Sequence, residues 1–160
     1  MPDDLAARIA ARLIARKETV AVAESSAGGL IAAALLAVPG ASAYFLGGAV
    51  IYTITAREAL LGITRADMDG LRPASEPYAR LLCGRMREKF ASTWAIAETG
   101  ATGPTGNRYG DAAGHACFGI AGPVALTRTL ETGLSERAEN MRRFTRAALE
   151  LFDEALAQAS

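Results

Sequence analysis

The stretch 19-TVAVAESSAGGLIAAALLAV-38 indicates the fold class. Its first six residues form a short apolar run rich in valine and alanine, which favours a buried strand. A polar turn with Gly28 and Gly29 follows, and then an apolar run that is typical of a buried helix. A strand, a turn and a helix in this order are the building unit of α/β domains.

The segments around this unit predict further elements of the same kind. Upstream, a helix is expected over residues 3–17, because its apolar residues recur on one face. Downstream, the pattern predicts a strand over residues 43–53, bent or bulged at Gly47 and Gly48. The remaining expected elements are a short helix capped by Thr55, a helix from Ser75 to about residue 90, a strand over 92–98, a hairpin over 115–130 and a closing helix over 136–157.

In chain order these elements predict an α/β fold, a single three-layer α/β/α domain with a mixed sheet over residues 1–160. The 17 basic residues balance the 17 acidic ones, so no overall field attracts nucleic acid or a membrane surface, and neither is expected as a partner. The N-terminal apolar residues are interrupted by arginines, which excludes a signal peptide or membrane span and favours a cytoplasmic protein. Cys83 and Cys117 lie in apolar segments without metal-ligand spacing, so packed thiols and no metal or cofactor are expected.

Two glycine-containing segments follow predicted strands, where α/β sheets usually bind ligands. In the first, free amides at the start of a helix favour an anion such as phosphate, although a plain capped helix with close packing is the alternative. The second lacks the Lys-Ser/Thr ending of a P-loop and is either a ligand loop or a long turn without function. The residues of the two segments are Glu24, Ser25, Ser26, Ala27, Gly28 and Gly29, and Gly100, Ala101, Thr102, Gly103 and Pro104.

A serine, a tyrosine and an arginine stand close together in the stretch 40-GASAYFLGGAVIYTITAREALLGI-63. Ser42 does not belong to a GxSxG nucleophile elbow, because it lies between a helix and a strand rather than after a strand. The only histidine, His115, falls in an apolar strand, where a packed imidazole is more common than a catalytic base. Arginines in the closing helix, Arg137 among them, either hold a phosphate or form a solvated basic face.

Five of these segments, in the same order, resemble motifs of the CinA C-terminal domain family. The family's AESCTGG-L-I-A pattern corresponds to residues 23–32, and its P-G-S-S-A-x-F segment to residues 39–45. Its G-x-V-x-Y-x-x-x-A-K-x-x-L-G-V, A-V-S and G-I-A-G-P-G-G segments correspond to residues 48–63, 74–77 and 100–106. The resemblance covers almost the whole chain.

The resemblance implies an activity, because active family members are PncC-type nicotinamide mononucleotide deamidases. They hydrolyse the nicotinamide carboxamide to give nicotinate mononucleotide and ammonia. Ser42 stands at the position of the family's serine, Tyr52 at that of a neighbouring tyrosine and Arg57 at that of its lysine. A guanidinium stays protonated and cannot act as a general base, but it can stabilise charge or grip an anion.

The resemblance therefore leaves two functions open. The first is a weak or substrate-shifted amidohydrolase in which Ser42, Tyr52 and Arg57 are the catalytic residues. The second is a catalytically silent member that binds a nucleotide-like ligand or a partner protein. In either case we expect a homo-oligomer, as in the family, and a common cleft formed by these three side chains and both glycine segments.

Overall fold

The computed structural model describes residues 3–159 and contains a five-stranded mixed sheet. The strand order is β2-β1-β3-β4-β5. The first three strands in the chain run parallel to one another, and the last two are antiparallel to their neighbours. The bounds are Val20–Glu24 for β1, Phe45–Val50 for β2, Trp94–Ala101 for β3, His115–Ala121 for β4 and Leu126–Glu131 for β5.

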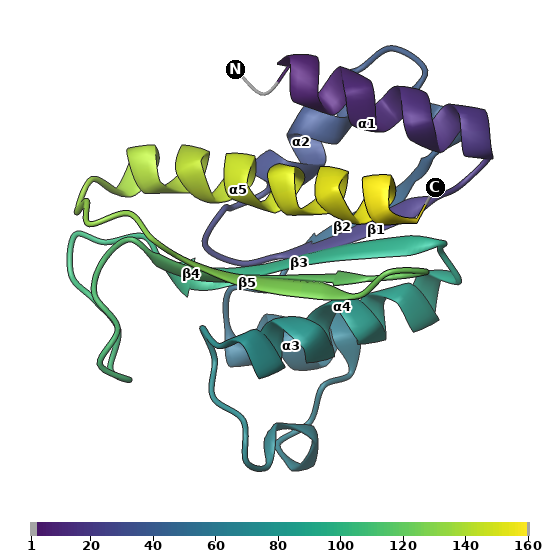
Figure 1. The fold of residues 1–160 in the computed structure, drawn as a ribbon. Coiled ribbons are helices and arrows are strands. Elements are labelled where there is room, and N and C mark those ends of the chain that lie inside the picture. Colours follow the sequence, from purple (N-terminus) through teal and green to yellow (C-terminus); the bar gives the residue numbers. More distant parts are fainter. Residues whose placement is uncertain (1–2, 160) are drawn as a thin grey trace.

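Helices cover both faces of this sheet, which confirms the predicted three-layer architecture (Figure 1). One layer contains three helices, and the opposite layer contains two. The first layer consists of α1 (Asp3–Arg16), α2 (Leu30–Leu36) and α5 (Arg137–Gln158), and the second of α3 (Ile54–Leu61) and α4 (Glu76–Phe90). Two short 3-10 helices, η1 (Ala41–Ala43) and η2 (Ala66–Met68), lie in the connections.

Each layer of helices encloses its own apolar core against the sheet. The core beneath α1, α2 and α5 contains most of the large side chains, and Trp94 packs edge-to-face on Phe152 with ring centroids 5.7 Å apart. The core beneath α3 and α4 is smaller and contains buried Cys83. Both cysteines are buried and free, as predicted. Within residues 3–159, the structure contains no helix that is long and apolar enough to cross a membrane.

Side-chain caps explain where the helices of the second layer begin. Ser75 caps α4 as predicted, because its hydroxyl accepts a hydrogen bond from the Tyr78 amide. The predicted cap of α3 at Thr55 is wrong. Thr53 takes that place, and its hydroxyl accepts from the Ala56 amide at 3.0 Å.

Strand β2 is shorter than the predicted strand over residues 43–53, and its bulge lies one residue earlier than predicted. Val20 pairs with Phe45 and Ala21 with Gly47, so the extra residue is Leu46. Gly47 has a packing role, since a Cβ there would lie 2.6 Å from the Phe90 ring. The chain before the strand turns through η1, which places Ser42 outside the sheet.

Candidate functional site

Three of the predicted site segments meet at one edge of the sheet. Because β1, β2 and β3 are parallel, their carboxyl ends share an edge, which is where ligands bind in open α/β sheets. The turn after β1, Tyr52 after β2 and the loop after β3 all lie there. We call this edge the carboxyl edge.

Tyr52 and the glycine-rich loop are joined at the carboxyl edge by the first turn of α5. Arg137 donates to the Tyr52 hydroxyl at 2.8 Å and to the Gly103 carbonyl at 2.7 Å. The Asn140 amide donates to the Thr102 carbonyl at 2.8 Å. Tyr52 is 58% exposed, so its hydroxyl region is accessible to a small molecule.

Arg137 differs from the other arginines of α5 that were considered as a phosphate site or a basic face. Arg142 and Arg143 both pair with Glu139, and Arg146 pairs with Glu150. Those pairs lie along the helix surface and leave little net charge. Among the described residues, Arg137 has no acidic partner, so its charge is available to a ligand at the carboxyl edge.

The turn after β1 is held by two of the protein's own carboxylates. One oxygen of Glu98 accepts from the amides of Ser25 and Ala27 at 2.9 and 2.8 Å, and the other accepts from the Ser26 hydroxyl. Glu24 accepts from the first amides of α2, at residues 31 and 32. These are the amides that were expected to be free for an anion, so the structure argues against a phosphate cradle in this turn.

Burial of these two carboxyl groups disfavours their charged forms and raises the pKa of each. Burial raises the pKa of Glu98 to about 7, although hydrogen bonds from Ser26 and two amides oppose the shift. The charge of Glu24 adds to the increase. Burial also raises the pKa of Glu24, against the hydrogen bonds from α2. A phosphate would have to approach these acids, which is a second argument against placing it here.

Ser42 lies at the opposite edge of the sheet from Tyr52. The Val20 amide, at the start of β1, donates to the Tyr44 carbonyl at 2.8 Å, which fixes η1 beside the amino ends of the strands. The six residues of β2 then separate Ser42 from Tyr52 by roughly 17 Å. The expectation that both line one cleft within a single chain is therefore wrong.

Arg57 lies in α3, on the other face of the sheet from α5, whose Arg137 contacts Tyr52. Its side chain is only 9% exposed and packs between α3 and α4, with its guanidinium carbon 6.0 Å from the centre of the Tyr78 ring. Its Nε is buried and has no hydrogen-bond partner among residues 3–159. Tyr52 instead contacts α5 in the other layer, so the two residues share the edge but face different helices.

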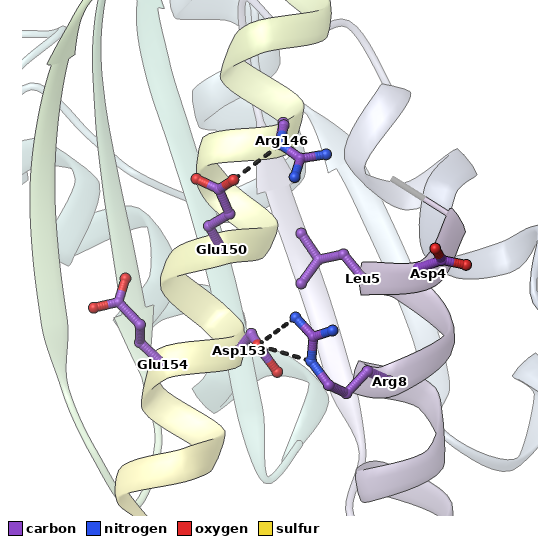
Figure 2. A pocket seen from close by; sticks show the side chains of 7 residues that line it. All are labelled: Asp4, Leu5, Arg8, Arg146, Glu150, Asp153 and Glu154. Carbon is purple, nitrogen blue, oxygen red and sulfur yellow. Dashed lines mark hydrogen bonds and ion pairs between the residues drawn. The ribbon is translucent and has the colours of Figure 1, made fainter. Parts of the chain in front are cut away.

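A surface hollow between α1 and α5 does not provide a better candidate (Figure 2). Most of the charges that line it are already paired with protein groups. Arg8 donates to Asp153 at 2.9 Å, and Arg146 donates to Glu150 at the same distance (Figure 2). Glu154 is paired with Arg128. The hollow is thus a network of surface ion pairs, which rarely indicates a site.

His115 is packed and hydrogen-bonded through both ring nitrogens. Nδ1 faces the Glu131 carboxylate, and Nε2 lies 2.7 Å from the Ala74 carbonyl. Both partners are acceptors, an arrangement that favours the doubly protonated imidazolium form. Burial alone lowers the pKa of His115, but Glu131, Ala74 and the charge of Asp111 together raise it. His115 thus ties β4 and β5 to the turn before α4 and is no free base.

This network predicts a loss of stability at alkaline pH. A histidine whose pKa is raised by folding stabilises the native state below its unfolded pKa of about 6.5, and the contribution disappears as pH rises through the raised value. Urea unfolding between pH 6 and pH 9 should show this decline for the wild type. In His115→Asn the decline should be much smaller, and an equal slope in both proteins would contradict the assignment.

A family model for the CinA C-terminal domain matches residues 2–156. The chain belongs to the CinA C-terminal domain family. CinA-like proteins from Gloeobacter violaceus and Synechococcus sp. (strain CC9902) are 40% identical over 152 residues and 39% identical over 121 residues. These matches cover 93% and 75% of this chain but only 35% and 29% of the relatives, so the chain spans about a third of their length.

Solved structures of the CinA superfamily have the same fold. A competence-damaged protein (CinA) superfamily protein from Klebsiella pneumoniae superposes with a TM-score of 0.91 at 26% identity and covers 99% of both chains. The competence/damage inducible protein CihA from Agrobacterium tumefaciens superposes with a TM-score of 0.89 at 29% identity, over 98% of this chain and 95% of that one.

Sequence reasoning missed three side chains of this CinA-family site. Glu98 shapes the turn after β1, and Tyr78 contacts Arg57. Arg137 was considered only as one member of a basic face. An acid inside the apolar run 94–98 was an available signal for Glu98, because a buried carboxylate requires donors. The contacts of Tyr78 and Arg137 are long-range and leave no local pattern.

Proposed function

We propose that this CinA-family chain is an amidohydrolase that acts on the carboxamide of nicotinamide mononucleotide. The observation that carries the proposal is the position of Tyr52, which stands at the family's tyrosine. Its exposed hydroxyl lies beside the loop after β3 and is held by Arg137. Family membership supports the reaction class.

The proposed reaction cleaves the amide C–N bond in two steps. The Ser42 hydroxyl adds to the carboxamide carbon, its proton passes to the departing nitrogen, and ammonia leaves. Water then adds to the serine ester, releasing nicotinate mononucleotide and restoring the hydroxyl. Tyr52 donates or relays the proton, and Arg57 stabilises negative charge on the oxygen that was the carbonyl.

We propose that a second copy of the chain supplies Ser42 to this site. Strand β2 is an edge strand, and two edge strands that lie antiparallel across a two-fold axis place the amino end of one beside the carboxyl end of the other. That arrangement brings Ser42 of one chain to Tyr52 of its partner. Large apolar side chains are exposed around β2, which supports self-association: Leu30, Leu36, Leu46, Val50 and Ile54.

The phosphate of the nucleotide is assigned to Arg137 in this proposal. The amides of the turn after β1 are already occupied by Glu24 and Glu98, whereas Arg137 is exposed and lacks an acidic partner among the described residues. A guanidinium binds phosphate through two parallel hydrogen bonds. In the loop after β3, Thr102 and Gly103 are buried, so the exposed residues 104–106 are the part available to the ribose.

Mixing two inactive variants tests the shared site. Ser42→Ala and Tyr52→Phe should each lose most of the turnover of nicotinamide mononucleotide. A mixture unfolded and refolded together should recover about a quarter of the wild-type rate, because half of the dimers are mixed and each contains one intact site. Ammonia release is the measurement, and refolded Ser42→Ala alone is the control. Absence of recovery would contradict a site shared between copies.

The second candidate function is a silent family member that binds a nucleotide, and it is favoured by Arg57. Loss of a general base removes about 10² to 10⁴ in rate, which leaves binding as the main remaining property. Calorimetry with nicotinamide mononucleotide separates the candidates. Binding without ammonia release above the Ser42→Ala control supports the silent member, and turnover above that control excludes it.

A further inference from the structure

Among the residues that the structure describes, Arg57 is a buried cation without an acidic partner. Only 9% of its surface is exposed to solvent, and no described aspartate or glutamate lies within ion-pair distance of it. Within residues 3–159 its Nε has no hydrogen-bond partner. Arg72, which is paired with Asp111, and Arg128, which is paired with Glu154, show the usual arrangement.

Such an arrangement is unfavourable unless an anion completes it. A charge removed from water loses hydration, and only an opposite charge or several acceptors replace it. Tyr78 gives partial compensation, because the guanidinium lies over its ring and the ring's face is electronegative. Burial raises the pKa of Tyr78, against the effect of Arg57, so Tyr78 remains a neutral phenol and not the missing counter-ion.

The chemistry of the guanidinium selects the kind of anion. It has only donors, in a planar fork that matches the two oxygens of a carboxylate. A carboxamide presents one oxygen and an amino group, and that amino group would face a second donor. The flat ring of Tyr78 beside the fork also suits a planar aromatic acid.

We propose that Arg57 and Tyr78 form a binding site for an aromatic carboxylate, the nicotinate group of the reaction product. This inference rests on the amidohydrolase function proposed above. Hydrolysis turns a neutral carboxamide into a carboxylate, so Arg57 binds the product more tightly than the substrate. The chain consequently retains nicotinate mononucleotide, and the product inhibits further turnover.

Calorimetric titration of the full chain tests this site with two nucleotides that differ only in the carboxyl group. The wild type should bind nicotinate mononucleotide at least about tenfold more tightly than nicotinamide mononucleotide. Arg57→Gln should reduce this ratio to near one. Arg65→Gln, which removes an exposed arginine before η2, should preserve it. Thermal unfolding establishes that each variant is folded.

Benzoate and benzamide provide a second pair of ligands that does not depend on nucleotide recognition. Equal affinity of the wild type for both nucleotides would overturn the carboxylate site and leave the proposed substrate class intact. Binding of benzoate that requires Arg57, with no binding of either nucleotide, would support the site and overturn the proposed substrate. Absence of binding by all four ligands would overturn both.

Discussion

Exchanging Arg57 for lysine is expected to increase the hydrolysis of nicotinamide mononucleotide by about 10² to 10⁴-fold. A guanidinium does not release its proton, whereas burial between α3 and α4 lowers the pKa of an ammonium group and frees it to act as a base. The exchange also removes the planar fork that favours the carboxylate product, so product release should become faster. Ammonia release at saturating substrate measures both effects.

Two further variants separate base catalysis from a general loosening of the site. Arg57→Gln removes the charge that stabilises the oxyanion and supplies no base, so its rate should not rise above that of the wild type. Combining Arg57→Lys with Ser42→Ala should abolish the gain. If Arg57→Lys is no faster than the parent protein, position 57 is not that of a general base, and the loss of a base does not explain a weak activity.

The elements of the fold were predictable because their signals are local. The apolar runs over residues 19–24 and 92–98 became β1 and most of β3, and Ser75 capped α4 as expected. Parallel strands with helices on both faces follow from that order of elements. The misplaced cap of α3 shows the limit, since Thr53 and Thr55 are equally good caps and the packing of α3 decides between them.

The candidate site was predictable only in part, because its residues meet through long-range geometry. Tyr52 and the loop after β3 were expected at strand ends, and they do meet at the carboxyl edge. Ser42 lies ten residues before Tyr52 in the chain, and a strand between two residues carries them to opposite edges. The predicted strand over residues 43–53 already implied this separation, but the two side chains were nevertheless expected to line a common cleft. Glu98 was missed because its donors are 71 to 73 residues away.

Replacing Glu98 with alanine is expected to lower the free energy of unfolding by about 3 to 5 kcal/mol. The carboxylate is fully buried and accepts from two amides and the Ser26 hydroxyl. Without it, three buried donors at the end of β1 have no acceptor, and a cavity remains. Urea unfolding measured by circular dichroism tests the size of the loss. A loss below about 1 kcal/mol would mean that water replaces the carboxylate at little cost.

Glu98→Gln is the matched variant, because it keeps an oxygen for the two amides while its amino group donates to Ser26. It should lose no more than about 1 kcal/mol and should remove a pH dependence that the wild type shows.

Folding raises the pKa of Glu98 from 4.5 to about 7, so the native state binds the proton more tightly. The contribution of Glu98 to stability is therefore largest below pH 4.5, decreases by roughly 3 kcal/mol as pH rises to 7, and is constant above. Glu24 titrates in both proteins, and because its charge interacts with Glu98, the difference between their pH profiles measures Glu98 together with that interaction. Parallel profiles would show that folding leaves the pKa of this carboxyl group unchanged, so that its three donors offset the effect of burial.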